Sequence, residues 1–263
     1  MSPDQNSIIA IVGPTGIGKT KLSISIAKAV GGEVVSVDSL QVYRQGRIMT
    51  AQATLEERQG VPHHMMDYLD ADEEPTEYNE QALDCISDIC SRGKVAVLCG
   101  GSTSLTEPLL FHPQIKKHHP LVLVLYSKLA TMGHLTDQRI DMMLEEGLLD
   151  EVQELRALQR ELPLEPDVTM GVFKSIGYSE LAPCLEQRNH VLAEQSFRKG
   201  VQRMKSSTRA YAEKQSIWIF NSLLPQVLRE QMDCHFFCLR GRSTFKADVE
   251  HKAVSLCQEW LHS

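Results

Sequence analysis

Residues 13 to 20 read GPTGIGKT, which matches the phosphate-binding pattern G-x-x-x-x-G-K-[ST]. In such a loop, backbone N–H groups and the start of the following helix bind a polyphosphate. Lys19 supplies a cation for the terminal phosphates, and the Thr20 hydroxyl is a ligand for Mg²⁺. The same pattern also arises by chance in loops without a ligand. We expect a diphosphate or triphosphate site with Mg²⁺ as its cofactor, in which the glycines are Gly13, Gly16 and Gly18.

The residues on either side of this loop are those needed to position it. An apolar run over 8–12 precedes the loop and predicts a buried strand. After the loop, Leu22, Ile26 and Ala29 recur at helical spacing over 21–30. Strand, loop and helix in this order form the context in which the motif is credible.

Further strands are predicted over 33–37, 94–98 and 121–125, with an amphipathic helix over 79–92. Strands that alternate with helices indicate a parallel sheet with right-handed crossovers. The predicted fold class is therefore α/β: a three-layer fold like that of P-loop NTPases, with a central parallel sheet. Its second half is predicted to be mostly helical.

Three polar or glycine-rich segments follow the ends of predicted strands: the loop 13–20, Asp38, and Gly100-Gly101-Ser102. Ligands of open parallel sheets bind beyond the carboxyl ends of the strands. These segments are therefore expected to line one cleft.

The second half carries two long helical patterns, over 137–158 with a break at Gly147, and over 191–220. The stretch 161–190 is interrupted by proline and glycine and is expected to wrap the cleft. Tyr211 is expected to belong to the core. We predict a single domain, 1–263, with a core over 8–130 and a helical part over 136–263.

Composition favours a cytoplasmic protein without a membrane partner. The 263 residues are 42% hydrophobic and contain no apolar run of 18 residues. The loop begins a dozen residues after Met1, so no signal or transit peptide is expected. The seven cysteines are scattered and form no C-x-x-C pair, which indicates free thiols. Cys234, His235 and Cys238 resemble half of a zinc site, but no second pair lies at the right spacing, so no zinc is expected.

The net charge of −7 disfavours broad attraction to nucleic acid, which depends on many contacts from Lys and Arg to phosphates. A local basic groove remains open, because one stretch is rich in cations. A solvated helix face explains this basic cluster equally well as a groove that binds nucleic acid. The cluster consists of Arg198, Lys199, Arg203, Lys205 and Arg209.

The loop alone would also suit a kinase or a nucleotide-binding module. Kinases and NTPases of this type usually carry a second acid at the end of another strand to hold Mg²⁺. Here the strand predicted over 94–98 leads into glycines and serine instead. Asp38 is the one acid at such a strand end, where it could orient an acceptor hydroxyl. The kinase therefore remains an alternative.

Several motifs together resemble the isopentenyltransferases, which move a dimethylallyl group from dimethylallyl diphosphate to the exocyclic amine of adenine. The resemblance covers roughly residues 8 to 220, and its last two segments look most like eukaryotic tRNA-modifying members. After GPTGIGKT, the matching segments are VSVDSLQVYR (35–44), GVPHH (60–64), GGSTS (100–104), QRIDMMLEEGLLDEV (138–152), GVFKSIGYSEL (171–181) and TRAYAEKQSIWI (208–219).

The resemblance implies a role for each candidate residue. The loop would hold the diphosphate of the prenyl donor, and Lys19, Mg²⁺ on Thr20 and Arg209 would stabilise it as it leaves. Asp38 would take a proton from the adenine amine, and Thr15 would lie near the reacting carbon. Arg139 would bind phosphate or pair with acids of its own helix. On the acceptor side the resemblance implies Ser39, Gln41, Thr50, Gly101 and Ser102.

Structural roles compete with these assignments. Asp38 could be a helix N-cap, and Ser102 and Thr103 could cap the next helix. His63 and His64 could be a metal pair, but adjacent side chains face different ways on a regular backbone, so structural or surface roles are favoured.

The acceptor is either a free adenine nucleotide or the adenosine beside the anticodon of tRNA. Members that act on tRNA carry a helical insertion, which is reduced here to 112–120, and many eukaryotic ones end in a zinc finger that this chain lacks. The family's Thr-x-Lys reads Thr50-Ala51-Gln52 here, which removes a cation. With the acidic balance, these features favour AMP, ADP or ATP, as in cytokinin synthesis. A tRNA partner is the alternative.

Overall fold

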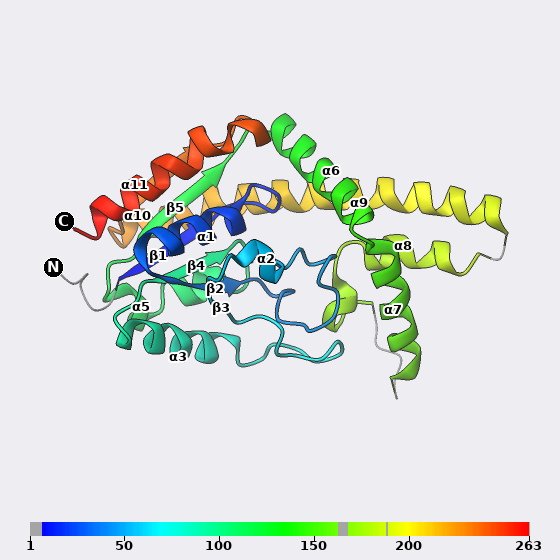
Figure 1. Cartoon of the computed structure of the whole chain (residues 1–263), viewed down its shortest axis with the longest axis horizontal. Helices are drawn as coiled ribbons and strands as arrows, with labels where there is room; N and C mark the ends of the chain where they lie inside the picture. Colours follow the sequence, from blue (N-terminus) through cyan, green and yellow to red (C-terminus); the bar gives the residue numbers. More distant parts are fainter. Residues whose placement is uncertain (1–6, 163–167, 188, 263) are drawn as a thin grey trace.

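A computed structural model describes residues 7–162, 168–187 and 189–262 (Figure 1). Six strands form one parallel sheet in the order β3-β2-β4-β1-β5-β6. The predicted α/β class with a central parallel sheet is confirmed. The strands are β1 (Ile8–Val12), β2 (Glu33–Val37), β3 (His63–His64), β4 (Ala96–Gly100), β5 (Leu121–Tyr126) and β6 (Cys234–Cys238).

Helices cover both faces of the sheet, and Figure 1 shows α1 and α11 on one side and α3 on the other. Short 3-10 turns span Gly171–Lys174 and Arg242–Thr244, and π-helical turns span Ile219–Leu223 and Lys246–Glu250. The α-helices are α1 (Lys19–Val30), α2 (Leu55–Arg58), α3 (Tyr78–Ser91), α4 (Thr106–Leu110), α5 (Pro113–Lys116), α6 (Leu129–Glu145), α7 (Leu148–Glu161), α8 (Tyr178–Leu185), α9 (His190–Trp218), α10 (Leu224–Arg229) and α11 (His251–Trp260). No described helix is long and apolar enough to span a bilayer.

The central strands are apolar throughout because both of their faces are covered. All five residues of β1 are buried. Its side chains alternate between two cores: Ala10 packs in the cluster that includes α3 and α10, and Ile11 packs in the cluster that includes α1 and α11. This packing holds the carboxyl end of β1, where the phosphate-binding loop begins, in the middle of the sheet.

The strand predicted over 94–98 is observed two residues later, as β4. The glycine at its end explains the difference. Gly100 pairs with Val12 on one side and Val37 on the other, and a Cβ at Gly100 would lie 2.3 Å from the Val37 carbonyl oxygen. Gly100 therefore belongs to the strand, and the turn starts at Gly101. The structure confirms the strands predicted over 8–12, 33–37 and 121–125, the last of which extends one residue further, to Tyr126. It also confirms the helices near 21–30 and 79–92.

Two edge strands were not predicted. β3 is only two residues long, and β6 lies in the C-terminal part that was expected to be helical. β6 pairs in parallel with β5 from Val122 to Tyr126, so the predicted core 8–130 does not contain the whole sheet. Cys234, His235 and Cys238, considered above as half of a zinc site, lie in this strand.

The helical half is arranged around α9, which runs well beyond the sheet in Figure 1. The predicted break at Gly147 is confirmed, since this residue has φ 100° between α6 and α7. Within the stretch 161–190, residues 163–167 and 188 lie outside the described residues, and the remainder includes a 3-10 turn and α8. α8 packs along α9, so this part of the stretch joins the helical layer.

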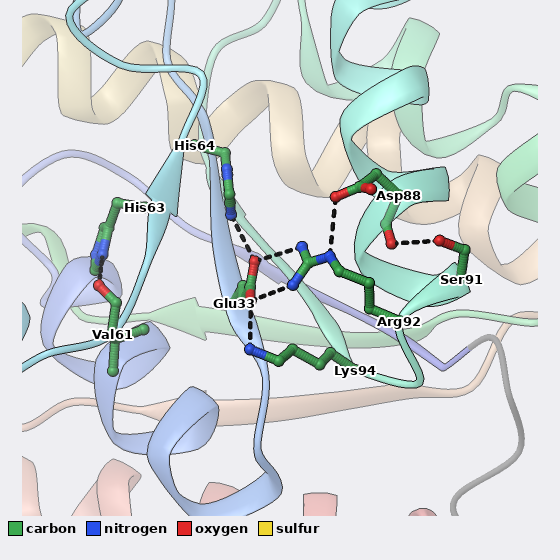
Figure 2. A network of polar contacts seen from close by, with 8 residues as sticks. All are labelled: Glu33, Val61, His63, His64, Asp88, Ser91, Arg92 and Lys94. Atoms are coloured by element: carbon green, nitrogen blue, oxygen red, sulfur yellow. Dashed lines mark hydrogen bonds and ion pairs between the residues drawn. The ribbon is translucent and has the colours of Figure 1, made fainter.

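Glu33, at the start of β2, joins the sheet edge to α3 in a charged network (Figure 2). Its side chain is only 3% exposed and pairs with His64 at 2.7 Å, Arg92 at 2.7 Å and Lys94 at 2.6 Å. His63 instead faces the Val61 carbonyl oxygen, with its Nδ1 at 2.9 Å. The two histidines therefore have separate structural partners, as predicted.

We expect Glu33→Gln to lower the free energy of unfolding by about 1–3 kcal/mol, because it leaves Arg92, Lys94 and His64 without the carboxylate that they share. Hydrogen bonds from Arg92, opposed by burial, hold the pKa of Glu33 well below its ordinary value of 4.5. Its stabilisation is therefore present above that value and is lost as the pH falls. Urea unfolding should show the difference between wild type and variant shrinking from about pH 6 to about pH 3.

Asp88→Asn is the matched control, because Asp88 contacts the same Arg92 but is 66% exposed. An exposed pair contributes about 0–1 kcal/mol. Equal losses in the two variants would contradict the importance of the buried carboxylate.

Candidate active site

The phosphate-binding loop connects β1 to α1 at the carboxyl edge of the sheet. Gly16 and Gly18 have φ of 79° and 98°, in the left-handed region that glycine adopts without strain. The first N–H groups of α1 have no acceptor within the helix, which makes them available to an anion. The loop therefore has the backbone geometry of an anion site.

The C-terminal segment supports this loop from behind, a contact the sequence did not reveal. A Cβ at Gly18 would lie 2.6 Å from a ring carbon of Phe245, so the aromatic ring packs directly on the loop. Lys21 lies over the same ring, with its Nζ 5.0 Å from the centroid. Phe245 therefore packs against the loop at Gly18, where the ring leaves no space for a side chain.

Lys19, at the start of α1, donates a hydrogen bond to the Pro14 carbonyl oxygen at 2.9 Å. Burial lowers the pKa of Lys19 to about 8, although the nearby Asp38 favours the charged form. Lys19 is therefore a cation at neutral pH that loses its charge under mildly alkaline conditions.

This pKa predicts a pH dependence of anion binding. Lys19 is charged below about pH 8 and neutral above it, so the Kd for inorganic pyrophosphate should rise by up to about tenfold per pH unit above that value. Isothermal titration at constant free Mg²⁺ measures this rise. Lys19→Arg keeps its charge over the same range and should lack the rise. The same pH dependence in both proteins would show that Lys19 is not its source.

Asp38 follows β2 directly and faces the loop. Its Oδ1 accepts a hydrogen bond from the Leu40 N–H at 3.0 Å, which forms a local turn. No helix starts at this position, so the alternative role as a helix N-cap is wrong. Burial first, and then Asp38, raises the pKa of Tyr211, and Asp38 also favours the charged form of Arg139. The Asp38 carboxylate therefore lies among groups from three separate segments.

The turn after β4 lies against the loop. A Cβ at Gly101 would be 2.4 Å from the Gly13 carbonyl oxygen and 3.4 Å from the Lys19 Nζ. Ser102 is buried, with its hydroxyl 3.2 Å from that of Ser104. α4 begins after Leu105 without a side-chain cap, so the capping role considered for Ser102 and Thr103 is wrong.

Gln215 of α9 joins the loop to this turn and was missed as a site residue. Its Oε1 accepts from the Thr15 N–H at 2.8 Å, and its Nε2 donates to the Gly101 carbonyl oxygen at 2.7 Å. Tyr211 lies one helical turn earlier and is only half-buried, outside both core clusters, which corrects its expected core position. The available signal was the segment TRAYAEKQ, in which Tyr211 and Gln215 are spaced to share a helix face.

Helix α6 contributes a guanidinium group to the loop. The Arg139 Nη1 lies 3.4 Å from the Thr15 hydroxyl oxygen, and a Cβ at Gly16 would lie 3.2 Å from Thr136. Burial lowers the pKa of Arg139. Of the two roles considered for Arg139, this position suits phosphate contact better than pairing with acids of its own helix.

Arg209 of α9 lies on the neighbouring side of α6. It packs over Gly133, and its Nη1 pairs with the Asp137 carboxylate at 3.1 Å. The side chain is 43% exposed, so it has room to move.

The loop on the acceptor side is fastened by its own polar side chains. Gln41 accepts from the Ser36 hydroxyl at 2.8 Å and donates to the carbonyl oxygens of Thr50 and Ala51. The Thr50 hydroxyl is turned to the Gly46 carbonyl oxygen at 2.8 Å. Gln41 and Thr50 therefore shape the loop, whereas Ser39 remains beside Asp38, half-buried.

Gln52 occupies the position of the missing lysine and is 9% exposed. Its Nε2 donates to the carbonyl oxygens of Gln41 and Tyr43, at 3.2 and 2.9 Å. It therefore stabilises the same loop and adds no positive charge to the acceptor side.

Four of the five cations in the basic cluster of α9 have partners. Lys205 pairs with Asp141 at 2.5 Å, Arg198 with Glu194 at 2.5 Å, and Arg209 with Asp137. Arg203 donates to the Glu180 carbonyl oxygen. Three of these charges are thus offset by carboxylates.

Comparison with known proteins gives consistent results. The sequence model described as IPP transferase matches residues 41–118 and 106–222. A bifunctional cytokinin biosynthesis protein from Fusarium pseudograminearum is 37% identical over 265 residues, which cover 100% of this chain and 54% of that protein. The chain therefore spans about half the length of this relative.

Two further matches involve proteins that act on tRNA. A tRNA dimethylallyltransferase from Saccharomyces cerevisiae is 27% identical over 331 residues, covering 97% of this chain and 76% of that protein. Among solved structures, a eukaryotic dimethylallyltransferase acting on tRNA superposes with a TM-score of 0.79 at 25% identity, covering 97% of this chain and 80% of that one.

Proposed function

Because this chain belongs to the IPP transferase family, we propose that it transfers a dimethylallyl group from dimethylallyl diphosphate to the exocyclic amine of a free adenine nucleotide. The observation that carries the proposal is the position of the Asp38 carboxylate, whose charge acts on Lys19, Arg139 and Tyr211, three groups from separate segments around the loop. An anion cradle with the Asp38 carboxylate beside it suits a reaction with a diphosphate leaving group and a weakly basic amine.

The loop binds the diphosphate of the donor in this proposal. The bond between the allylic carbon and the bridging oxygen breaks, and its electron pair stays on the diphosphate. Lys19 and Arg139 stabilise the growing negative charge, as fixed cations do in a site prepared for the transition state. Arg209 leaves Asp137 and pairs with the diphosphate instead. The exposure of the Arg209 side chain allows this movement.

The residues of the loop also suit Mg²⁺. Mg²⁺ is usually held by one or two protein oxygens together with phosphate oxygens and water. The hydroxyl of Thr20, in the first turn of α1, would be such a ligand, and the diphosphate would supply others. When bound, Mg²⁺ neutralises charge on the leaving diphosphate.

Asp38 acts on the acceptor. The adenine amine is a poor nucleophile because its lone pair is delocalised into the ring. One Asp38 oxygen is engaged by the Leu40 N–H, and the second orients the amine and takes its proton as the new carbon–nitrogen bond forms. General-base assistance of this kind contributes about 10²–10⁴-fold to the rate.

Three observations favour a free nucleotide as the acceptor. The connection between α4 and β5 holds only the short α5, Gln52 lacks the charge of a lysine, and the acids beside α9 offset much of its basic cluster. The 37% identity to a cytokinin biosynthesis protein agrees with this choice. The second candidate, transfer to tRNA, is favoured by the match to a dimethylallyltransferase acting on tRNA.

The test supplies the purified chain with labelled dimethylallyl diphosphate, Mg²⁺ and one acceptor at a time. Labelling of AMP, ADP or ATP without labelling of unmodified tRNA supports the proposal. Labelling of tRNA alone would overturn the choice of acceptor and retain the chemistry. Phosphate transfer from ATP without use of the donor would instead establish a kinase, and nucleotide binding without turnover would establish a binding module.

A further inference from the structure

Gln215 is the one side chain seen to hydrogen-bond both catalytic segments among the described residues. It lies 200 positions from Thr15 and 114 from Gly101, and it is 3% exposed. Its oxygen accepts at 2.8 Å from the first segment, and its nitrogen donates at 2.7 Å to the second. Both halves of the amide are therefore used, each on a different segment.

A glutamine side chain meets both requirements at once. One arm must accept from an N–H and the other must donate to a carbonyl oxygen, and an uncharged amide has one group of each kind. Ionised glutamate lacks the donor, and asparagine is one methylene shorter. A buried amide or carbonyl group that loses its partner is costly, so the pairing is strongly selected once the chain is folded.

The two segments joined by Gln215 serve different substrates in the proposed reaction. Thr15 belongs to the donor loop, and its hydroxyl lies 3.4 Å from Arg139. Gly101 opens the turn that was assigned to the acceptor. Transfer requires the reacting atoms about 3–3.5 Å apart, and a displacement of about 1 Å can cost about 10²-fold. The spacing of the two segments therefore controls the rate.

We propose that Gln215 is a positioning residue that sets the distance between the donor loop and the acceptor turn. The inference rests on the proposed dimethylallyl transfer but holds for either acceptor. Because each segment keeps its own strand and helix, each substrate still binds when Gln215 is replaced. The loss appears in the rate of transfer from the fully bound state.

The test compares Gln215→Met, Gln215→Glu and the control Glu213→Gln, an exposed residue on the same helix. Single-turnover transfer is measured with both substrates saturating, and the Kd of inorganic pyrophosphate is measured separately. Gln215→Met, which preserves length without hydrogen bonds, should transfer about 10- to 100-fold more slowly. Its Kd should stay within about threefold of wild type, and the control should match wild type.

Gln215→Glu adds a readout that a purely structural role would not change. A protonated carboxyl group donates to Gly101 as the amide does, whereas the ionised form cannot. The rate of this variant relative to wild type should therefore rise as the pH falls from about 8 to about 5.5. A flat ratio would overturn the proposal.

Amide hydrogen exchange tests the same bridge without turnover. In Gln215→Met, exchange should increase in peptides covering 13–18 and 101–105 and stay unchanged over 21–30 of α1 and in β4. Unchanged exchange in both peptides, or wild-type transfer rates, would overturn the role of Gln215. If wild type modifies no acceptor while exchange still responds to Gln215→Met, the proposed function fails and the bridge stands.

Discussion

Asp38→Asn should reduce the transfer rate at saturating substrates by about 10²–10⁴-fold, the usual contribution of a general base. The amide oxygen of the new side chain can still accept from the Leu40 N–H, so the local turn is preserved. What is lost is the ability to take a proton from the adenine amine. Single-turnover kinetics should show this loss, while the Kd of pyrophosphate changes by less than about threefold.

Asp141→Asn provides the control, because it removes an equal charge from a side chain of α6 that is 54% exposed and pairs with Lys205 of α9. It should transfer at close to the wild-type rate. If Asp38→Asn retained wild-type turnover, Asp38 would not be the base. If the Kd rose by the same factor as the rate fell, Asp38 would act on the donor instead.

The same variant should also change the alkaline limit of anion binding. Asp38 favours the protonated form of Lys19, so its removal lowers the pKa of Lys19 below about 8. The rise in the Kd of pyrophosphate should then begin at a lower pH than in wild type.

Gly101→Ala should reduce kcat/KM by at least about 10²-fold, because a methyl group there displaces the turn from the donor loop. The added carbon would lie 2.4 Å from the Gly13 carbonyl oxygen and 3.0 Å from the Gln215 Nε2. A backbone carbonyl in a loop held by β1 and α1 cannot move aside cheaply. Steady-state kinetics with both substrates varied would measure the effect.

The control is Gly241→Ala, where the backbone is extended at φ 172° and no atom lies within 4 Å of the new Cβ. This variant should match wild type in both rate and melting temperature. Wild-type kinetics for Gly101→Ala would mean that the turn at Gly101 has room for a methyl group beside the Gly13 carbonyl oxygen.

Much of the site follows from local patterns. The phosphate-binding loop, the strands on either side of it and Asp38 at the end of β2 were all predicted from residue order and periodicity. These features depend on neighbours a few positions away, which is the range over which strand and helix patterns operate. The register of β4 was predicted less well, because Gly100 belongs to the strand only when Val37 lies beside it.

The sequence by itself determined the fold class, the anion loop and the acid placed beside it, since strand ends in a parallel sheet meet at one edge. Only the tertiary structure decided the position of Gln215, the structural use of Gln41 and Thr50, and the pairing of Lys205 and Arg209 of α9 with acids of α6. Those features depend mainly on contacts between segments far apart in the chain. Periodicity carries no information about such contacts, because packing and hydrogen bonding select them only when the helices and the sheet come together.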